Sequence, residues 1–227
     1  MKGNHGSMKP PLVISYDSFI PAEFFDDLVH DAADSGFTVE IESRKVAPVA
    51  GLEWLLATSV FVLLLKPFLD AFLKRAADDV ANAAYPQMKS AIAKLASKVL
   101  ISTRESWVRI TSSGPLPRAG RSCFFSIQAE INESRTVRFV FNEGSDEATY
   151  ERCVSEAFRL LEAHYGKTAP DPFADVPVDE ARARIFMVYD DNLKQWRAID
   201  LNTEIRRIAD ESRERQENSG DSTLNPS

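Results

Sequence analysis

The sequence predicts an α+β fold, a mixed or antiparallel sheet of about six to seven strands covered by a long apolar helix or helical hairpin at residues 52–100. Three observations predict it. Short segments alternate apolar and polar residues with period two, as half-buried strands do. Other segments carry apolar residues at helical spacing. Residues 54–65, WLLATSVFVLLL, contain no charge at all.

The opening of the chain predicts a strand, a helix and a second strand. Residues 12–16 form a short apolar run typical of a buried strand. Pro21 suits the first turn of a helix, which we expect to continue to about Ser35 and to end at Gly36. Residues 37–42 then alternate apolar and polar side chains, as a half-buried strand does.

This opening also resembles a known family over about thirty residues. Residues 12–43, through Ile14-Ser15-Tyr16 and the amphipathic helix, are similar to the first strand–helix–strand of a TIR domain. The rest of the chain departs from that pattern, because no catalytic glutamate can be placed and the apolar segment has no counterpart. The resemblance therefore implies the local fold and no function.

The uncharged segment at residues 54–65 is predicted to be helical, and three interpretations stay open. Twelve helical residues span about 18 Å, against about 30 Å for the apolar core of a bilayer. Extension back to residue 46 adds Pro48, Gly51 and Glu53, which a membrane span does not favour. We expect a core helix enclosed by the rest of the chain; the alternatives are a membrane-inserting helix at 46–73 and an interface helix.

The pattern changes after residue 65. Pro67 is expected to kink the helix or to start a new one. A further helix is predicted after Pro86, with one apolar face and one basic face. Its inward residues are expected to be Met88, Ile92, Leu95 and Val99, and its outward residues Lys89, Lys94 and Lys98.

Residues 107–142 predict antiparallel strands. Residues 107–111 form one short strand, followed by a loop. Residues 123–131 and 136–141 both alternate with period two and are joined by a polar turn at 132–135. Two such runs around a short turn predict a β-hairpin with one polar face.

The remaining segments are a helix, a hairpin and a tail. Ser145 is expected to cap a helix that ends at Gly166. A last hairpin is predicted from residues 184–189 and 195–199. We expect residues 1–10 to be a disordered start or tag remnant, 11–201 a single domain, and 202–227 a charged helix that fades into a disordered tail.

Composition predicts a cytoplasmic protein, with membrane association as the alternative. The formal net charge is −7, which does not favour nucleic acid as a partner. Cys123 and Cys153 give no disulfide framework, and we expect both to be buried free thiols in a reducing compartment; a disulfide between them is the alternative. No secretory leader is recognised at the N-terminus.

Motifs for catalysis or cofactor binding are not found, so no catalytic residue and no cofactor are predicted. The candidate metal ligands are His30, Asp26 and Asp34, which fall at neighbouring helical positions. One histidine with scattered carboxylates lacks a specific ligand spacing, so a solvated acidic face is the alternative interpretation.

Charge is distributed unevenly along the chain. Residues 17–42 contain eight acidic residues and neither lysine nor arginine, whereas residues 104–143 contain six arginines against four glutamates. Of these arginines, Arg118, Arg121 and Arg138 are the candidate interaction residues, since guanidinium groups bind phosphates and acidic partners. A solvated sheet face is the alternative explanation.

These observations predict a non-enzymatic interaction module or a subunit of a bacterial protein assembly. Its partner is expected to be another protein or a second copy. The alternative is a membrane-inserting protein that acts through residues 46–73.

Overall fold

The computed structural model describes residues 12–35, 37–45, 58–74, 79–106, 110–111, 114–115, 121–167, 170–204, 206–207 and 210. Its elements, in chain order, are β1 (Leu12–Asp17), the 3-10 turn η1 (Ala22–Phe25), α1 (Asp26–Ser35), β2 (Val39–Arg44), β3 (Val60–Leu64), α2 (Lys66–Lys74), α3 (Asp79–Ser106), β4 (Ile110–Thr111), β5 (Gly114–Pro115), β6 (Arg121–Glu130), β7 (Thr136–Asn142), α4 (Glu147–Tyr165), β8 (Arg184–Asp190) and β9 (Gln195–Ile199).

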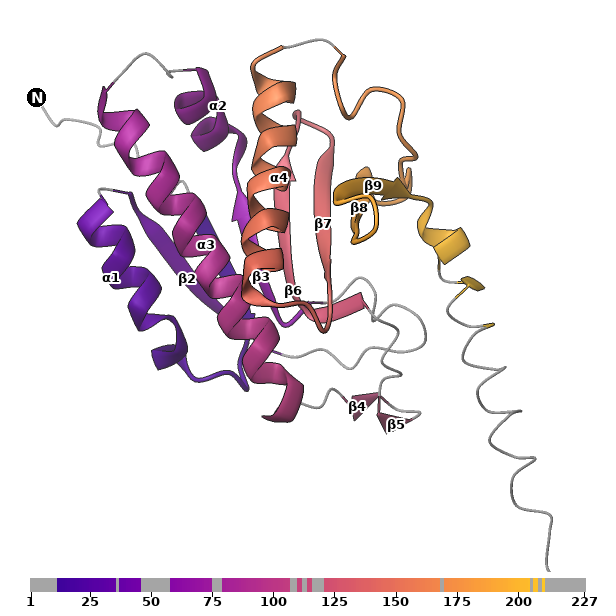
Figure 1. Ribbon diagram of the computed structural model, residues 1–227, viewed down its shortest axis with the longest axis horizontal. Coiled ribbons are helices and arrows are strands. Elements are labelled where there is room, and N and C mark those ends of the chain that lie inside the picture. Colours follow the sequence, from indigo (N-terminus) through magenta and orange to yellow (C-terminus); the bar gives the residue numbers. More distant parts are fainter. Residues whose placement is uncertain are drawn as a thin grey trace, which may run out of the picture.

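Seven strands form one mixed sheet in the order β2-β1-β3-β6-β7-β8-β9 (Figure 1). The pairs β1/β2, β3/β6 and β7/β8 are parallel. The pairs β1/β3, β6/β7 and β8/β9 are antiparallel. The predicted α+β class with a mixed sheet is therefore confirmed.

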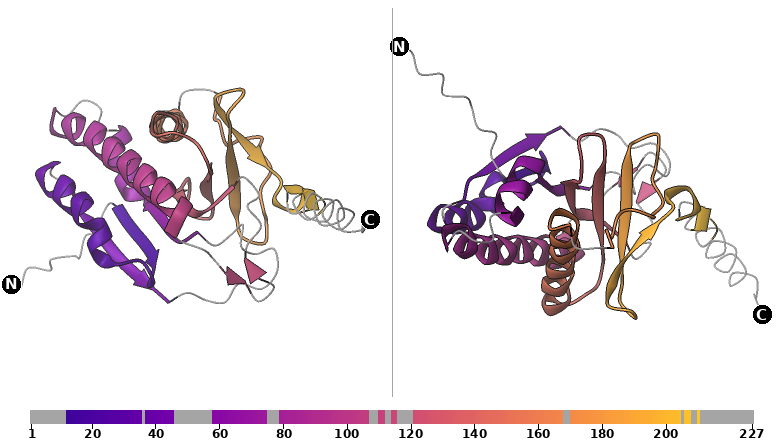
Figure 2. Two further views of the ribbon diagram at one scale, coloured as in Figure 1. Left: turned by 60° about the horizontal axis from the view of Figure 1, so that its bottom comes forward. Right: turned by 90° about the horizontal axis from the view of Figure 1, so that it is seen from above.

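Helices α1, α3 and α4 form one layer over the sheet (Figure 2). One of them lies between the two strands of each parallel pair in the sequence, as parallel pairing requires a long crossover connection. The main core fills the space between this layer and the sheet, and its fully buried side chains include Ile14, Val62, Ile92, Phe139 and Phe158. We call the opposite face of the sheet the second face.

The prediction that the apolar run at residues 54–65 begins a long helix over 52–100 is wrong where the structure describes that run. Residues 60–64 form β3, near the middle of the sheet between β1 and β6. Val60, Val62 and Leu64 face the core, and the residues between them are half-buried. A strand that has other strands on both sides and little exposure on either face has a continuous apolar sequence. Hydrophobic periodicity alone cannot distinguish such a sequence from that of a buried helix. Residues 54–57 lie outside the described part.

The helical part of the 52–100 segment begins later than predicted. Pro67 lies in the first turn of α2, where its missing N–H is tolerated. Helix α3 begins at Asp79 and contains Pro86, which was expected to precede it. The four residues predicted to face inward are buried, and Lys94 is exposed as predicted.

The two predicted hairpins are confirmed. Strands β6 and β7 pair antiparallel around a turn at residues 132–135, and β8 and β9 pair antiparallel as well. Helix α4 is also present, but its N-cap is Asp146 rather than Ser145, since the Asp146 carboxylate accepts a hydrogen bond from the Thr149 N–H. Of the strand expected at 107–111, only Ile110–Thr111 is described, as β4. The predicted N-terminal start and most of the predicted C-terminal tail lie outside the described residues.

Candidate interaction surface

Strand β2 lies at one edge of the sheet. It pairs with β1 on its inner side, and on its outer side it pairs with no strand that the structure describes. The period-two pattern that predicted this strand also sets its faces. Val39 and Ile41 pack against the main core and stay half-buried, whereas Glu40 and Glu42 are exposed.

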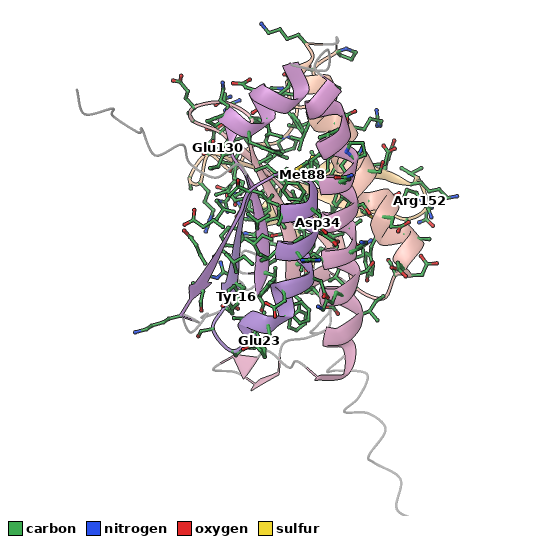
Figure 3. The ribbon with its side chains drawn as sticks, turned by 90° about the vertical axis from the view of Figure 1, so that its left-hand side faces the viewer. Tyr16, Glu23, Asp34, Met88, Glu130 and Arg152 are labelled. Atoms are coloured by element: carbon green, nitrogen blue, oxygen red, sulfur yellow. The ribbon has the colours of Figure 1, made fainter. Side chains whose placement is uncertain are left out.

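Helix α1 lies beside β2 on the same side of the molecule (Figure 3). Its apolar stripe, with Leu28 and Ala32, is buried against the core. Glu23 in η1, and Asp26 and Asp34 in α1, are exposed. We define the acidic edge as the five exposed carboxylates at this end of the sheet, of which Glu23, Asp26 and Asp34 lie on the helix side and Glu40 and Glu42 on the second face.

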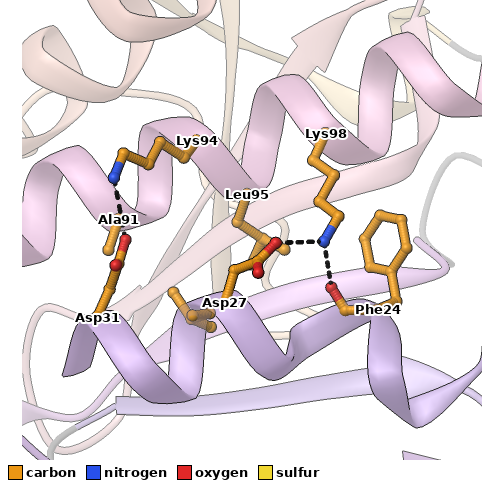
Figure 4. Close-up of a pocket in the computed structure, with 8 residues that line it drawn as sticks. Phe24, Asp27, Asp31, Ala91, Lys94, Leu95 and Lys98 are labelled. Atoms are coloured by element: carbon orange, nitrogen blue, oxygen red, sulfur yellow. Dashed lines mark hydrogen bonds and ion pairs between the residues drawn. The ribbon is translucent and has the colours of Figure 1, made fainter. Parts of the chain in front are cut away.

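Two further carboxylates of α1 bind α3 instead. Lys98 donates to the Asp27 carboxylate at 2.9 Å, and Lys94 donates to the Asp31 carboxylate at 3.0 Å (Figure 4). The hydrogen bond and the positive charge of Lys98 lower the pKa of Asp27. Lys98 also donates to the backbone carbonyl of Phe24 at 2.9 Å. These contacts fasten α1 to α3.

A groove of about 340 Å³ lies between α1 and α3 at these ion pairs. Its apolar floor includes Leu28, Ala91 and Leu95, which are already buried by the two helices. Since little apolar surface is left to cover, the groove offers a ligand only a small hydrophobic contribution. We therefore interpret it as the seam of a helix–helix contact.

The predicted metal ligands belong to this exposed side of α1. His30 Nε2 lies 3.5 Å from Asp34 Oδ2, and both side chains are largely exposed. Asp26 is exposed one turn earlier. Within the described ranges, no three histidine, cysteine, aspartate or glutamate side chains are arranged to hold a metal ion.

Of the three predicted interaction arginines, the structure describes the side chain of Arg138 alone. Arg118 lies outside the described residues, and of Arg121 only the backbone, in β6, is described. Arg138 lies on the second face of the sheet and is only 4 % exposed. Its guanidinium is therefore not presented to a partner on the surface.

Arg138 instead belongs to a polar network across the second face. Its Nη2 donates to Thr58 Oγ1 at 2.8 Å, and Thr58 Oγ1 lies 2.8 Å from Ser126 Oγ. Arg44 donates to the Thr58 carbonyl and, at 2.9 Å, to the Asp17 carboxylate. This network was not predicted from the sequence, because its members come from four strands and one loop. The only local signal was the hydroxyl pair Thr58-Ser59 within the apolar run.

A histidine–aspartate pair lies at the end of α4. His164 Nδ1 is 2.9 Å from Asp171 Oδ1, and His164 Nε2 is 2.9 Å from the Ile131 carbonyl oxygen. Partial burial raises the pKa of Asp171, but hydrogen bonds from the Phe173 N–H and from His164 outweigh it, and the net shift is downward. Since both imidazole nitrogens already face acceptors, the pair ties three segments together rather than activating a nucleophile.

Cys153 is a buried free thiol, as predicted. Burial, and to a smaller extent the nearby charge of Asp191, raises the pKa of this thiol to about 12. A thiol with such a pKa stays protonated near neutrality and is a poor nucleophile. The side chain of Cys123 lies outside the described part.

Comparison with known proteins identifies no family. No family model matches the chain, and no curated protein and no solved structure matches it either. Among the helices of the described residues, none has the length and apolar character needed to cross a membrane.

Proposed function

We propose that this protein is a non-enzymatic interaction module that binds a basic segment of a protein partner at its acidic edge. The observation that carries the proposal is the position of β2, an edge strand that carries the exposed Glu40 and Glu42 and whose outer side pairs with no strand among the described residues. Exposed sheet edges are sites where other chains bind, and carboxylates select a partner of opposite charge.

The charge of the acidic edge favours a basic protein segment as the partner over nucleic acid or a second copy of this chain. Asp27 and Asp31 are neutralised by lysines of α3, but the five carboxylates of the acidic edge have no such lysine contact in the described part, apart from the weak pairing of Asp34 with His30. Nucleic acid would be repelled by this surface. A second copy bound through the same strand would bring Glu40 and Glu42 close to their own equivalents, which is destabilising.

We do not propose a membrane-inserting role for residues 46–73, the segment on which that alternative depended. Residues 60–64 of it form a central strand, and residues 66–74 form the short helix α2. Both elements contribute buried residues to the core, namely Val62 and Leu69.

The proposal is tested with a labelled peptide of alternating lysine and valine, KVKVKV, and fluorescence anisotropy. We expect salt-sensitive binding to the native protein and a loss of affinity of about tenfold or more in Glu40→Lys/Glu42→Lys. The matched control is Glu151→Lys/Glu180→Lys, which changes net charge equally at exposed positions on α4 and before β8. Equal affinity of the two double variants would contradict the proposal.

A further inference from the structure

We infer that the basic segment binds as an extended strand that adds to the outer side of β2 and becomes the eighth strand of the sheet. The inference rests on the proposed function and specifies the conformation of the partner. It is distinct from binding to the charged surface alone, in which the peptide backbone takes no part.

The backbone of β2 requires this conformation. A strand at the end of a sheet directs every second N–H and C=O group away from its only neighbour. An extended chain satisfies this row of groups through ladder hydrogen bonds, whereas a helix uses its own backbone groups internally. Strand β2 has six residues, Val39–Arg44, and therefore offers a ladder of about 20 Å.

The side chains of β2 define the sequence pattern of the partner. Val39 and Ile41 point to the core side and are incompletely covered, and Glu40 and Glu42 point to the second face. Side chains of neighbouring strands on one face lie next to each other. An added strand therefore places apolar side chains beside Val39 and Ile41, and lysine or arginine beside Glu40 and Glu42. The partner motif therefore alternates basic and apolar residues over about four positions, opposite residues 39–42, since Arg44 at the end of β2 is itself a cation paired with Asp17.

The test compares KVKVKV with two N-methylated derivatives, which are isomers of each other and keep the charge and the side chains of the parent peptide. One isomer is N-methylated on every lysine and the other on every valine, so that each loses the N–H donors along one edge of the strand. If the peptide adds to β2, only one edge faces the protein. One isomer then loses affinity by about tenfold or more, and the other binds as the parent peptide does.

The outcomes separate the two proposals. If the isomers behave alike, whether both bind or both fail, strand addition is overturned, while the dependence of the parent peptide on Glu40 and Glu42 still supports the proposed function. If the parent peptide binds without dependence on those two glutamates, the proposed function itself fails. A direct readout is hydrogen exchange, in which strand addition slows the outward-facing amides of residues 39–44.

Discussion

At the scale of single residues, Thr58 connects the polar groups of the second face. Its hydroxyl contacts both Arg138 and Ser126, and its carbonyl accepts a hydrogen bond from Arg44. The Thr58 side chain is almost completely buried. A buried cation is costly unless its donors find acceptors, so this one hydroxyl has a larger effect on stability than its size suggests.

We predict that Thr58→Val lowers the free energy of unfolding by about 2 kcal/mol, because it removes an acceptor from the buried Arg138 while keeping the shape of the side chain. Ser126→Ala, which removes only a neutral partner, is expected to cost about 1 kcal/mol. Urea denaturation of both variants measures the difference. An equal or larger loss in Ser126→Ala would show that the Arg138 contact contributes little.

The lowered pKa of Asp171 predicts that the stability of the fold depends on pH. Because its pKa in the folded protein is lowered from 3.8, the carboxylate stabilises the fold above about pH 4, and this contribution is lost as the pH falls through the lowered value. In Asp171→Asn the loss of stability between pH 6 and pH 3 should therefore be smaller than in the native protein. Thermal unfolding at the two pH values tests this, and an unchanged difference would refute it.

At the scale of elements, β3 shows most clearly what the sequence could not predict. Strand β2 and the β6/β7 hairpin alternate with period two because one face of each is more polar, and that signal was sufficient to identify them. Strand β3 has apolar residues on both faces, so only the β-propensity of Val60, Phe61 and Val62 favoured a strand. Its position between β1 and β6 depends on contacts distant in the sequence.

The alternation within β3 is directly testable. Leu64 is fully buried in the core, whereas Leu63 is half-buried on the second face. We expect Leu64→Ala to cost about 3 kcal/mol of unfolding free energy and Leu63→Ala less than half of that. Chemical denaturation of the two variants provides the comparison. Equal losses in the two variants would argue against the alternation of buried and half-buried faces along β3.

The candidate site was predictable only in part. The acidic character of residues 17–42 was evident from the sequence, and the structure places its exposed carboxylates on η1, α1 and β2. That β2 is the outermost strand was not evident, since edge position depends on the order of all seven strands. The arginines, by contrast, drew attention through their number, although the guanidinium of Arg138 is buried.

At the scale of the whole molecule, stability should decrease from the centre of the sheet to its edges. Strands β3, β6 and β7 have a neighbour on both sides, whereas β2 and β9 have one each among the strands that the structure describes. We expect amides of the central strands to exchange slowest with solvent and those of the two edge strands fastest. Hydrogen exchange followed by mass spectrometry measures this order. Slow exchange throughout β2 in the unbound protein would mean that its outer side is already protected.

The start of α2 has a consequence for how the chain assembles. Its first backbone amide, that of Lys66, donates at 2.8 Å to the carboxylate of Glu130, a residue 64 positions further along at the end of β6. Strand β3, immediately before this helix, is also flanked by β6. A ribosome must therefore synthesise residues up to about Glu130 before either element is complete, and a nascent chain that ends before β6 exposes β3 as an unprotected apolar edge.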